Sequence, residues 1–249
     1  MGLFGLFGSK DEREKSALKK LAKTVTQRYG PPENRQRALE QLGSLGTADA
    51  LRTLCLRFTV HAEPGITDGE EKERARRILV EAGAAAAEPV SEFVRAQESG
   101  VAWGLRALAE IWPAEKVTAF VLEELARLSR VYTRDPEKKL VLLTWLVEHK
   151  DASPPGDVPG ALLPLLEDFS DDVRIGAVRA LAALAPVEPV REGLIQLFLR
   201  DRDNARVRGE VLEAMAHIGA DVKGYRPTVE TLLVEPYFLD REGRVKKRG

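Results

Sequence analysis

The chain has 249 residues, 44% of them hydrophobic and 31% charged, which is an ordinary balance for a globular protein that can bury a sizeable core. Its single cysteine excludes an internal disulfide framework and a cysteine-built zinc site, and its three scattered histidines offer little for a metal cluster. No apolar run approaches the roughly 18 residues of a membrane-spanning helix. With no secretory signal evident, we expect a cytoplasmic protein that carries no cofactor.

The net charge of −1 conceals an uneven distribution of charged residues. Residues 1–30 carry a net charge of +4 and residues 237–249 one of +3, so the remaining body carries −8. A general nucleic-acid binder needs clustered lysines and arginines, because these release counterions from the phosphates. The acidic body therefore makes nucleic acid an unlikely class of partner.

The first nine residues are an apolar segment whose large side chains are separated by glycines: Leu3, Phe4, Leu6 and Phe7. A basic helix is predicted to follow within residues 10–30, from Lys10 to Tyr29. An apolar segment beside basic residues suits a weak peripheral contact with an anionic membrane, or insertion into a pocket of a partner. A disordered tail is an equal alternative, so three interpretations of this segment stay open.

One helical pattern recurs between residues 31 and 236. Two copies, 34 residues apart, have apolar residues at i, i+4, i+7, i+8 and i+11: Val173, Ala177, Ala180, Leu181 and Leu184 in one, and Val207, Val211, Ala214, Met215 and Ile218 in the other. This spacing is one stripe of a 3.6-residue helix. Weaker copies upstream, each followed by a second apolar helix, predict about six helical hairpins behind the basic helix.

Capping residues and prolines predict where several helices begin. Thr47 is a good N-cap for a helix that reaches Phe58. Pro89 and Pro189 are expected at or near a first helical turn, where the missing N–H costs nothing. Asp135-Pro136 is expected to open another helix. These signals divide the body into short helices joined by short loops.

Strand alternation is nearly absent from the chain. The stretch Tyr237–Val245, with Glu242-Gly243 as a possible turn, is the one place where extended structure is expected. It lies in a basic tail of residues 237–249. Residues 153–160, rich in proline and glycine, are the clearest loop.

The best copy of the repeat resembles a known family. Asp168-x-x-x-x-Val173-Arg174, followed by Ala177-x-x-Ala180-Leu181-x-x-Leu184, is similar to a HEAT repeat of the kind related to phycobilin-lyase repeats, and residues 30–46 look like the same consensus. The resemblance implies a right-handed, all-α solenoid of the armadillo type, whose second helices line a concave face. It also implies a structural role, tying one repeat to the next, for three residues: Asp168, Arg174 and Arg208. It implies no reaction, because these repeats serve unrelated functions.

Few residues suggest catalysis, so we expect no enzyme. Cys55 lies between leucines, as a small buried residue would, and no phosphate loop or nucleophile elbow is present. The histidines lack partners at metal-ligand spacing: His61, His149 and His217. Some HEAT-like proteins are DNA-alkylation glycosylases that use aromatic side chains. The chain has three tryptophans, which either pack in the core or serve such an enzyme: Trp103, Trp112 and Trp145. A glycosylase and a bilin lyase are therefore retained as alternative functions.

The predicted second helices carry a pattern of carboxylates. Glutamates four residues apart share a helix face, and this spacing occurs twice, 100 residues apart, with a further pair in the intervening helix: Glu88 and Glu92, Glu188 and Glu192, and Glu123 and Glu124. Stacked repeats would align these residues, either as a solvated face or as an acidic groove for a basic peptide or surface. The sequence therefore favours a non-enzymatic scaffold that binds another protein, with a HEAT-fold enzyme as the alternative.

Overall fold

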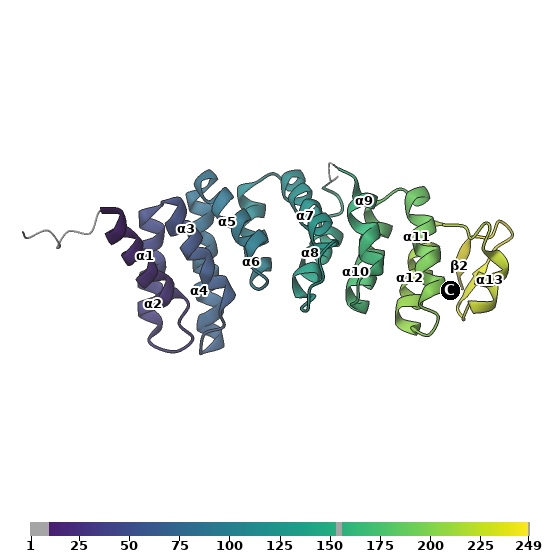
Figure 1. Cartoon of the computed structure of the whole chain (residues 1–249), viewed down its shortest axis with the longest axis horizontal. Helices are drawn as coiled ribbons and strands as arrows, with labels where there is room; N and C mark the ends of the chain where they lie inside the picture. The colour runs from purple at the N-terminus through teal and green to yellow at the C-terminus, as the bar shows by residue number, and fades with distance from the viewer. Residues whose placement is uncertain (1–9, 153–155, 249) are drawn as a thin grey trace, which may run out of the picture. The chain divides into compact units, whose positions relative to one another are not determined.

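The computed structural model of the chain describes residues 10–152 and 156–248. The described residues are mostly helical and include one short two-stranded hairpin, which confirms the predicted all-α class (Figure 1). They divide into two compact units, with the boundary in the chain between Pro113 and Ala114. The apolar segment lies outside the described residues, and with it four predicted interaction residues: Leu3, Phe4, Leu6 and Phe7.

The first unit consists of two layers of helices and one end helix. Its elements are α1 (Lys10–Val25), α2 (Pro32–Leu45), α3 (Ala48–Cys55), the 3-10 helix η1 (Leu56–Thr59), α4 (Gly65–Ala82), α5 (Ala84–Ala96) and α6 (Val101–Ile111). α2, α4 and α6 contact one another in turn, and α3 packs against α5 in the other layer. α1 lies against α2, α3 and η1, so it covers one end of the two layers.

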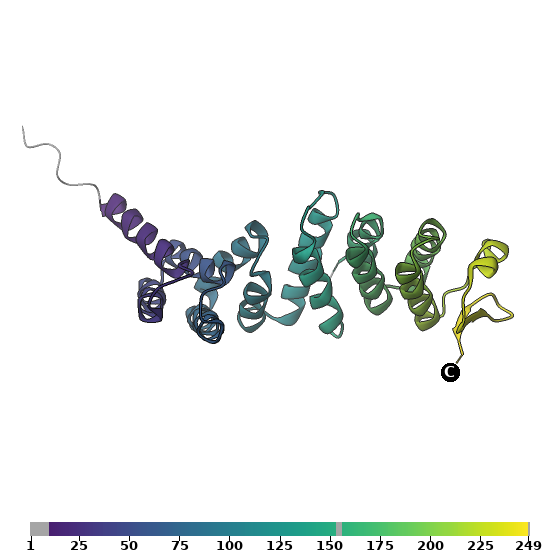
Figure 2. The same cartoon turned by 90° about the horizontal axis from the view of Figure 1, so that it is seen from below.

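The second unit repeats this two-layer arrangement (Figure 2). Its elements are α7 (Ala114–Leu128), α8 (Glu137–Glu148), α9 (Val158–Leu162), the 3-10 helix η2 (Leu163–Glu167), α10 (Asp171–Leu184), α11 (Val187–Arg200), α12 (Ala205–Ile218), α13 (Arg226–Leu232), β1 (Tyr237–Leu239) and β2 (Val245–Lys247). α8, α10 and α12 contact one another in turn, and α7, α9, η2 and α11 form the opposite layer. The single right-handed solenoid expected over residues 31–236 spans both units and stays a prediction.

Local sequence explains the helices and the buried stripe. The Thr47 side-chain oxygen accepts a hydrogen bond from the Ala50 N–H at 3.3 Å, as its predicted role as an N-cap requires. Asn204 caps α12 in the same way through the Val207 N–H at 3.1 Å. The periodic apolar residues of α10 and α12 form the core, and six of them are 0% exposed: Val173, Ala177, Ala180, Leu181, Val207 and Val211.

The short hairpin confirms the extended stretch predicted near residue 240. β1 and β2 pair antiparallel, with Tyr237 opposite Lys247 and Leu239 opposite Val245. Gly243 has a φ of 79° in the turn between them, a conformation that glycine adopts without a steric cost. The hairpin packs against α12, where its β2 strand covers one end of the second unit.

Glycines let neighbouring helices approach closely in the first unit. A Cβ atom at Gly43 in α2 would lie 2.5 Å from Ile78 Cγ2 in α4, and one at Gly104 in α6 would lie 2.6 Å from Val94 Cγ2 in α5. Both distances are far shorter than a van der Waals contact between carbon atoms, so a larger residue at either position would force the helices apart.

Three predicted helix boundaries differ from the structure. Pro89 lies inside α5 rather than in its first turn, because α5 already begins after Gly83, which has a φ of 57°. The basic helix ends at Val25 rather than at Tyr29. The helix capped by Thr47 changes to 3-10 geometry at Leu56. The local sequence pattern predicts where a helix lies more reliably than it predicts where the helix ends. In the last turn, tertiary contacts compete with the i→i−4 hydrogen bonds.

Candidate functional site

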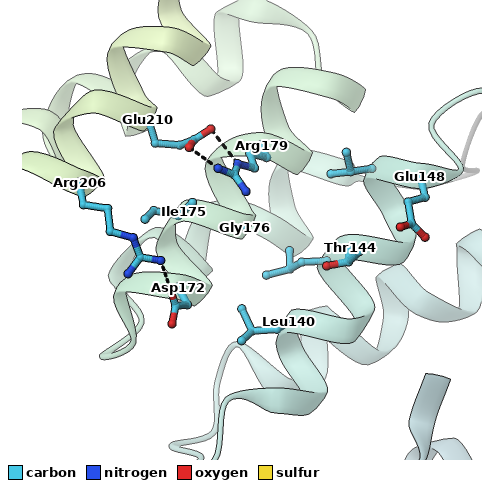
Figure 3. Close-up of a pocket in the computed structure, with 11 residues that line it drawn as sticks. Leu140, Thr144, Glu148, Asp172, Ile175, Gly176, Arg179, Arg206 and Glu210 are labelled. Carbon is cyan, nitrogen blue, oxygen red and sulfur yellow. Dashed lines mark hydrogen bonds and ion pairs between the residues drawn. The ribbon is translucent and has the colours of Figure 1, made fainter.

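A groove of about 510 Å³ opens on the layer of α8, α10 and α12 in the second unit (Figure 3). Its floor is apolar and comes from α8 and α10: Leu140, Leu143, Val147, Ile175 and Gly176. Leu143 is 1% exposed and Ile175 is 5% exposed, so the floor of the groove is the outer side of the hydrophobic core. We call this feature the α8–α10 groove.

Gly176 keeps the floor of the α8–α10 groove free of a projecting side chain. A Cβ atom at this position would lie 3.0 Å from Leu143 Cδ1, which is tighter than nearly all contacts of real Cβ atoms. Glycine therefore allows α10 to approach α8 while the surface above the two helices stays open (Figure 3). A branched residue at position 176 would close the groove and strain the core beneath it.

Two ion pairs between α10 and α12 form one wall of the α8–α10 groove (Figure 3). Arg179 donates to Glu210 through Nε at 2.8 Å and through Nη2 at 2.6 Å, and Arg206 pairs with Asp172. The hydrogen bond with the Glu210 carboxylate raises the pKa of Arg179, so this guanidinium stays charged. Because each cation faces an anion, the wall is polar without a strong net charge.

Glu148 on α8 supplies the remaining carboxylate of the groove. It is exposed, and its side chain forms no hydrogen bond or ion pair with another residue in the described ranges. Thr144 lies one turn earlier on the same helix and adds a hydroxyl group. The α8–α10 groove thus combines an apolar floor, a neutralised wall and one free negative charge.

The α8–α10 groove was not predicted from the sequence, although the sequence contains one signal for its wall. Asp172 and Arg206 have opposite charges and are 34 residues apart, which is the period of the repeat. The first unit contains two such pairs at the same separation, Arg74 with Glu40 and Arg76 with Glu110. Opposite charges one repeat apart on first helices therefore indicate ion pairs between neighbouring repeats.

The three residues predicted to tie the repeats together each contact a neighbouring element. Arg174 places its Nε 3.0 Å from Asp201 Oδ2, just before α12, and donates from Nη1 to the Asp168 carbonyl at 2.6 Å. The Asp168 carboxylate instead accepts from Lys139 of α8 at 2.7 Å. No ion pair joins the side chains of Asp168 and Arg174 within the described structure. Each residue therefore links successive repeats, but the Asp–Arg pair that the resemblance implies is replaced by pairs with other residues.

Arg208 extends this series of contacts to the next element. Its Nη1 donates to the Arg202 carbonyl at 2.9 Å, and its Nη2 donates to the Leu232 carbonyl at the end of α13. Its guanidinium carbon also lies 5.2 Å from the centre of the Phe198 ring. These partners are backbone carbonyls and a core aromatic ring, so they favour the structural role predicted for Arg208 over ligand binding.

The first unit contains a buried charge cluster that the sequence did not predict: Arg35, Arg57, Asp68, Glu71 and Lys72. The Glu71 carboxylate accepts from Arg35 Nε at 2.8 Å and from Arg57 Nε at 2.9 Å, and all three side chains are 0% exposed. Arg57 also reaches Asp68 at 2.5 Å, and Lys72 lies 2.8 Å from the same carboxyl group. The cluster joins α2, η1 and α4, which are separate in the sequence.

The carboxyl group of Asp68 is held ionised within the buried charge cluster. Burial opposes ionisation, but hydrogen bonds from Lys72, from the Ala62 N–H and from Arg57 outweigh it and lower the pKa of Asp68 to about 2. The carboxyl group of Asp68 is therefore charged at neutral pH. The charged groups of the cluster pair with one another, although Arg35 Nη2 has no hydrogen-bond partner within the described structure, so we assign the cluster to packing.

The two predicted glutamates of the first unit lie on α5, and one of them is neutralised. Glu88 is exposed, whereas Glu92 pairs with Arg52 of α3, and that hydrogen bond lowers the pKa of Glu92. The pair lies across a second groove of about 370 Å³, whose apolar lining includes Leu56 and Phe93. The surface there is consequently less acidic than the sequence pattern predicts.

The four predicted glutamates of the second unit have different environments. Glu124 has a side chain that is 2% exposed and pairs with Arg127 at 2.7 Å, so it cannot belong to an accessible acidic surface. Glu192 accepts hydrogen bonds from the Tyr225 hydroxyl at 2.5 Å and from Gln196 at 2.8 Å, and these bonds lower its pKa. The other two are exposed: Glu123 on α7 and Glu188 on α11.

The residues considered for catalysis are placed in packing contacts. Trp103 stacks on Phe58 with ring centres 6.0 Å apart, and Trp145 stacks on His149 at 3.8 Å. Burial raises the pKa of the Cys55 thiol to about 12. Within the described ranges, no group of three or more histidine, cysteine or acidic side chains is placed to hold a metal ion. No helix among the same residues combines the length and apolar character needed to cross a bilayer.

Comparisons with known proteins identify no family. No family model matches the chain, and no curated protein matches it. Among solved structures, an engineered protein is 20% identical, with a TM-score of 0.43, over 91% of this chain and 69% of that one. A designed armadillo repeat protein in complex with the peptide (KR)4 is 21% identical, with a TM-score of 0.37, over 85% of this chain and 95% of that one. The chain is thus a helical repeat protein by its own helices, and its assignment to the HEAT type stays an expectation.

Proposed function

We propose that this protein is a non-enzymatic helical-repeat scaffold that binds a segment of another protein in the α8–α10 groove. The observation that carries the proposal is the combination of an apolar floor with one free carboxylate, Glu148, on a surface whose other charges are paired. A groove of about 510 Å³ is also within the roughly 300–1,000 Å³ range of ligand-binding sites. The single free thiol, Cys55, supports a reducing and hence cytoplasmic location.

The chemistry of the groove defines the partner segment. Two apolar side chains from one face of a helix would cover the floor, and a neighbouring lysine or arginine would meet Glu148. Burying two leucine-sized side chains contributes about 3–6 kcal/mol before the cost of association is subtracted. We therefore expect weak, reversible binding in the micromolar range or above, with an association rate that falls as salt rises.

A peptide-display experiment tests the proposal. A random-peptide library is selected on the full-length protein, and the recovered peptides are measured against Glu148→Lys and against Glu188→Lys as the matched control. Glu188 is also exposed and in the second unit, but it lies on α11 in the opposite layer. The proposal expects peptides with apolar residues beside a basic residue, and loss of their binding in Glu148→Lys alone.

The same experiment separates the groove from the second-helix surface predicted by the sequence. If Glu188→Lys abolishes binding and Glu148→Lys does not, the partner binds the exposed carboxylates of the second helices. If neither variant changes the binding of the recovered peptides, the α8–α10 groove is not the site. The glycosylase and bilin-lyase alternatives have less support, because Trp103 and Trp145 are engaged in ring stacking within the fold.

A further inference from the structure

The hairpin of β1 and β2 leaves one side of its small sheet unpaired. β2 is paired on both sides, since β1 lies along one side and residues 220–222 lie along the other. On that second side, the Val245 N–H donates to the Ala220 carbonyl at 3.3 Å. Among the described elements, β1 makes extensive contact with β2 only. β1 is therefore an edge strand of the second unit.

The register of the hairpin shows which backbone groups of β1 point outward. Leu239 lies opposite Val245, and the Val245 N–H points away from β1 toward Ala220. Both members of such an antiparallel pair direct their N–H and C=O groups away from each other. The Leu239 N–H, the Leu239 C=O and the Tyr237 C=O accordingly point outward, and none of them forms a hydrogen bond within the described ranges. We call these three groups the β1 edge.

The side chains of the hairpin alternate between two faces of different character. The inner face is held on α12, where the Tyr237 hydroxyl donates to Glu213 at 2.5 Å and Lys247 donates to the same carboxylate at 2.8 Å. The outer face carries the exposed ring of Phe238 and three cations that share its side of the sheet: Arg244, Lys246 and Arg248. The hairpin thus presents an aromatic and basic surface beside its open edge.

The positive charge of this outer face is only partly neutralised by the protein. Arg248 pairs with Glu235 at 3.2 Å. The side chains of Arg244 and Lys246 form no ion pair or hydrogen bond with another residue in the part of the chain that the structure describes. Residues 237–249 carry a net charge of +3, so a negatively charged partner complements this surface.

We propose that the β1 edge binds an extended acidic segment of a partner protein as an added strand. The backbone of the segment pairs with the outward groups of Leu239 and Tyr237, and its acidic side chains lie on the outer face beside Phe238. Arg244 and Lys246 lie one strand farther away, about 10 Å from the added strand, so they attract its carboxylates through the solvent rather than by contact. This site is separate from the α8–α10 groove, for which a basic segment is proposed.

An acidic strand fits this surface better than a second copy of the chain or a nucleic acid. Two hairpins placed edge to edge would bring together two stretches that each carry a net charge of +3, and such like charges repel. Single-stranded nucleic acid binds by stacking bases on free aromatic faces, but the Arg248 guanidinium carbon lies 5.5 Å from the centre of the Phe238 ring. Nucleic acid also has no ladder of N–H and C=O groups to pair with the β1 edge.

The test measures the binding of synthetic peptides to the full-length protein by calorimetry at low salt. The probe alternates valine and glutamate over about six residues, the usual length of a strand. Three matched peptides replace glutamate by lysine, carry N-methyl groups on the valine amides, or carry them on the glutamate amides. Only alternate N–H groups of a strand face its neighbour, so we expect one methylated peptide to lose binding at least tenfold and the other to bind like the probe. The lysine peptide should not bind.

Variants of the protein test the same site from the other side. Leu239→Pro removes the outward N–H without touching the ladder to β2, so it should weaken binding of the probe at least tenfold. Arg244→Ser with Lys246→Ser should weaken it about fourfold, since a charge pair about 10 Å apart in water contributes about twofold. Arg130→Ser with Lys150→Ser is the control, because it removes two exposed, unpaired cations that follow α7 and α8.

Circular dichroism verifies that each variant keeps its helical content, and the methylated peptides decide the question on the wild-type protein if Leu239→Pro unfolds. The proposal is overturned if the probe does not bind, if the lysine peptide binds equally, or if both methylated peptides behave alike. It is also overturned if the two pairs of cation variants bind the probe equally. Self-association that Leu239→Pro abolishes would identify a second copy as the occupant. Tighter binding of a single-stranded oligonucleotide, lost with Arg244 and Lys246, would identify nucleic acid instead.

Discussion

The buried charge cluster makes Glu71 the residue whose neutralisation should most damage the first unit. Glu71 is the shared acceptor of Arg35 at 2.8 Å and of Arg57 at 2.9 Å. The substitution Glu71→Gln keeps the shape of the side chain but removes its charge. Three cations of the cluster, Arg35, Arg57 and Lys72, would then face the single carboxylate of Asp68.

The expected loss of stability is large because the remaining charges cannot reach water. Breaking a buried ion pair by removing one partner typically costs about 3–5 kcal/mol. A whole domain is stable by only about 5–15 kcal/mol, so Glu71→Gln should remove about a fifth or more of that stability. Glu40→Gln is the matched control, since Glu40 also pairs with an arginine but its side chain is 51% exposed. We expect that variant to lose no more than about 1 kcal/mol.

Urea unfolding followed by circular dichroism measures both variants, and amide hydrogen exchange locates the change. Protection should fall in α2, η1 and α4 of the first unit, with the second unit unaffected. The double variant Arg35→Met with Glu71→Gln should recover part of the loss, because one uncompensated cation is removed. If Glu71→Gln unfolds within about 1 kcal/mol of the wild type, the argument from burial is refuted.

Two further predictions concern the contacts between repeats. Arg174→Ala and Arg208→Ala should each lower the free energy of unfolding by about 1–3 kcal/mol, as expected for lost charge-assisted hydrogen bonds. Arg130→Ala is the control and should be neutral, because it removes an exposed and unpaired side chain. Wild-type melting of both variants would contradict the structural role. Gly43→Ala should destabilise the first unit by about 1–3 kcal/mol, because the added Cβ would overlap Ile78. Gly69→Ala in α4 is the control: its Cβ meets nothing within 4 Å, so the variant should be neutral or stabilising. Equal thermal midpoints for these two glycine variants would argue against close helix approach.

The helical repeat could be predicted from the sequence because its signals are local. The stripe that contains Val173 and Val207 repeats with the period of a helix, and each buried residue lies within four positions of the next. The Thr47 cap and the extended stretch near Gly243 depend on neighbours only a few residues away. Such information is complete within one or two turns of the chain.

The candidate site and the buried charges depend instead on residues brought together by stacking. Glu71 and Arg35 are 36 residues apart, and no spacing rule within one helix distinguishes their pairing from that of exposed charges. The α8–α10 groove exists because Gly176 and Leu143 meet across two helices, and the Glu124 side chain is 2% exposed in the fold, where it pairs with Arg127. Tertiary structure decided these features, since the free energy of a charge depends on its burial and on its partners, and a linear pattern specifies neither.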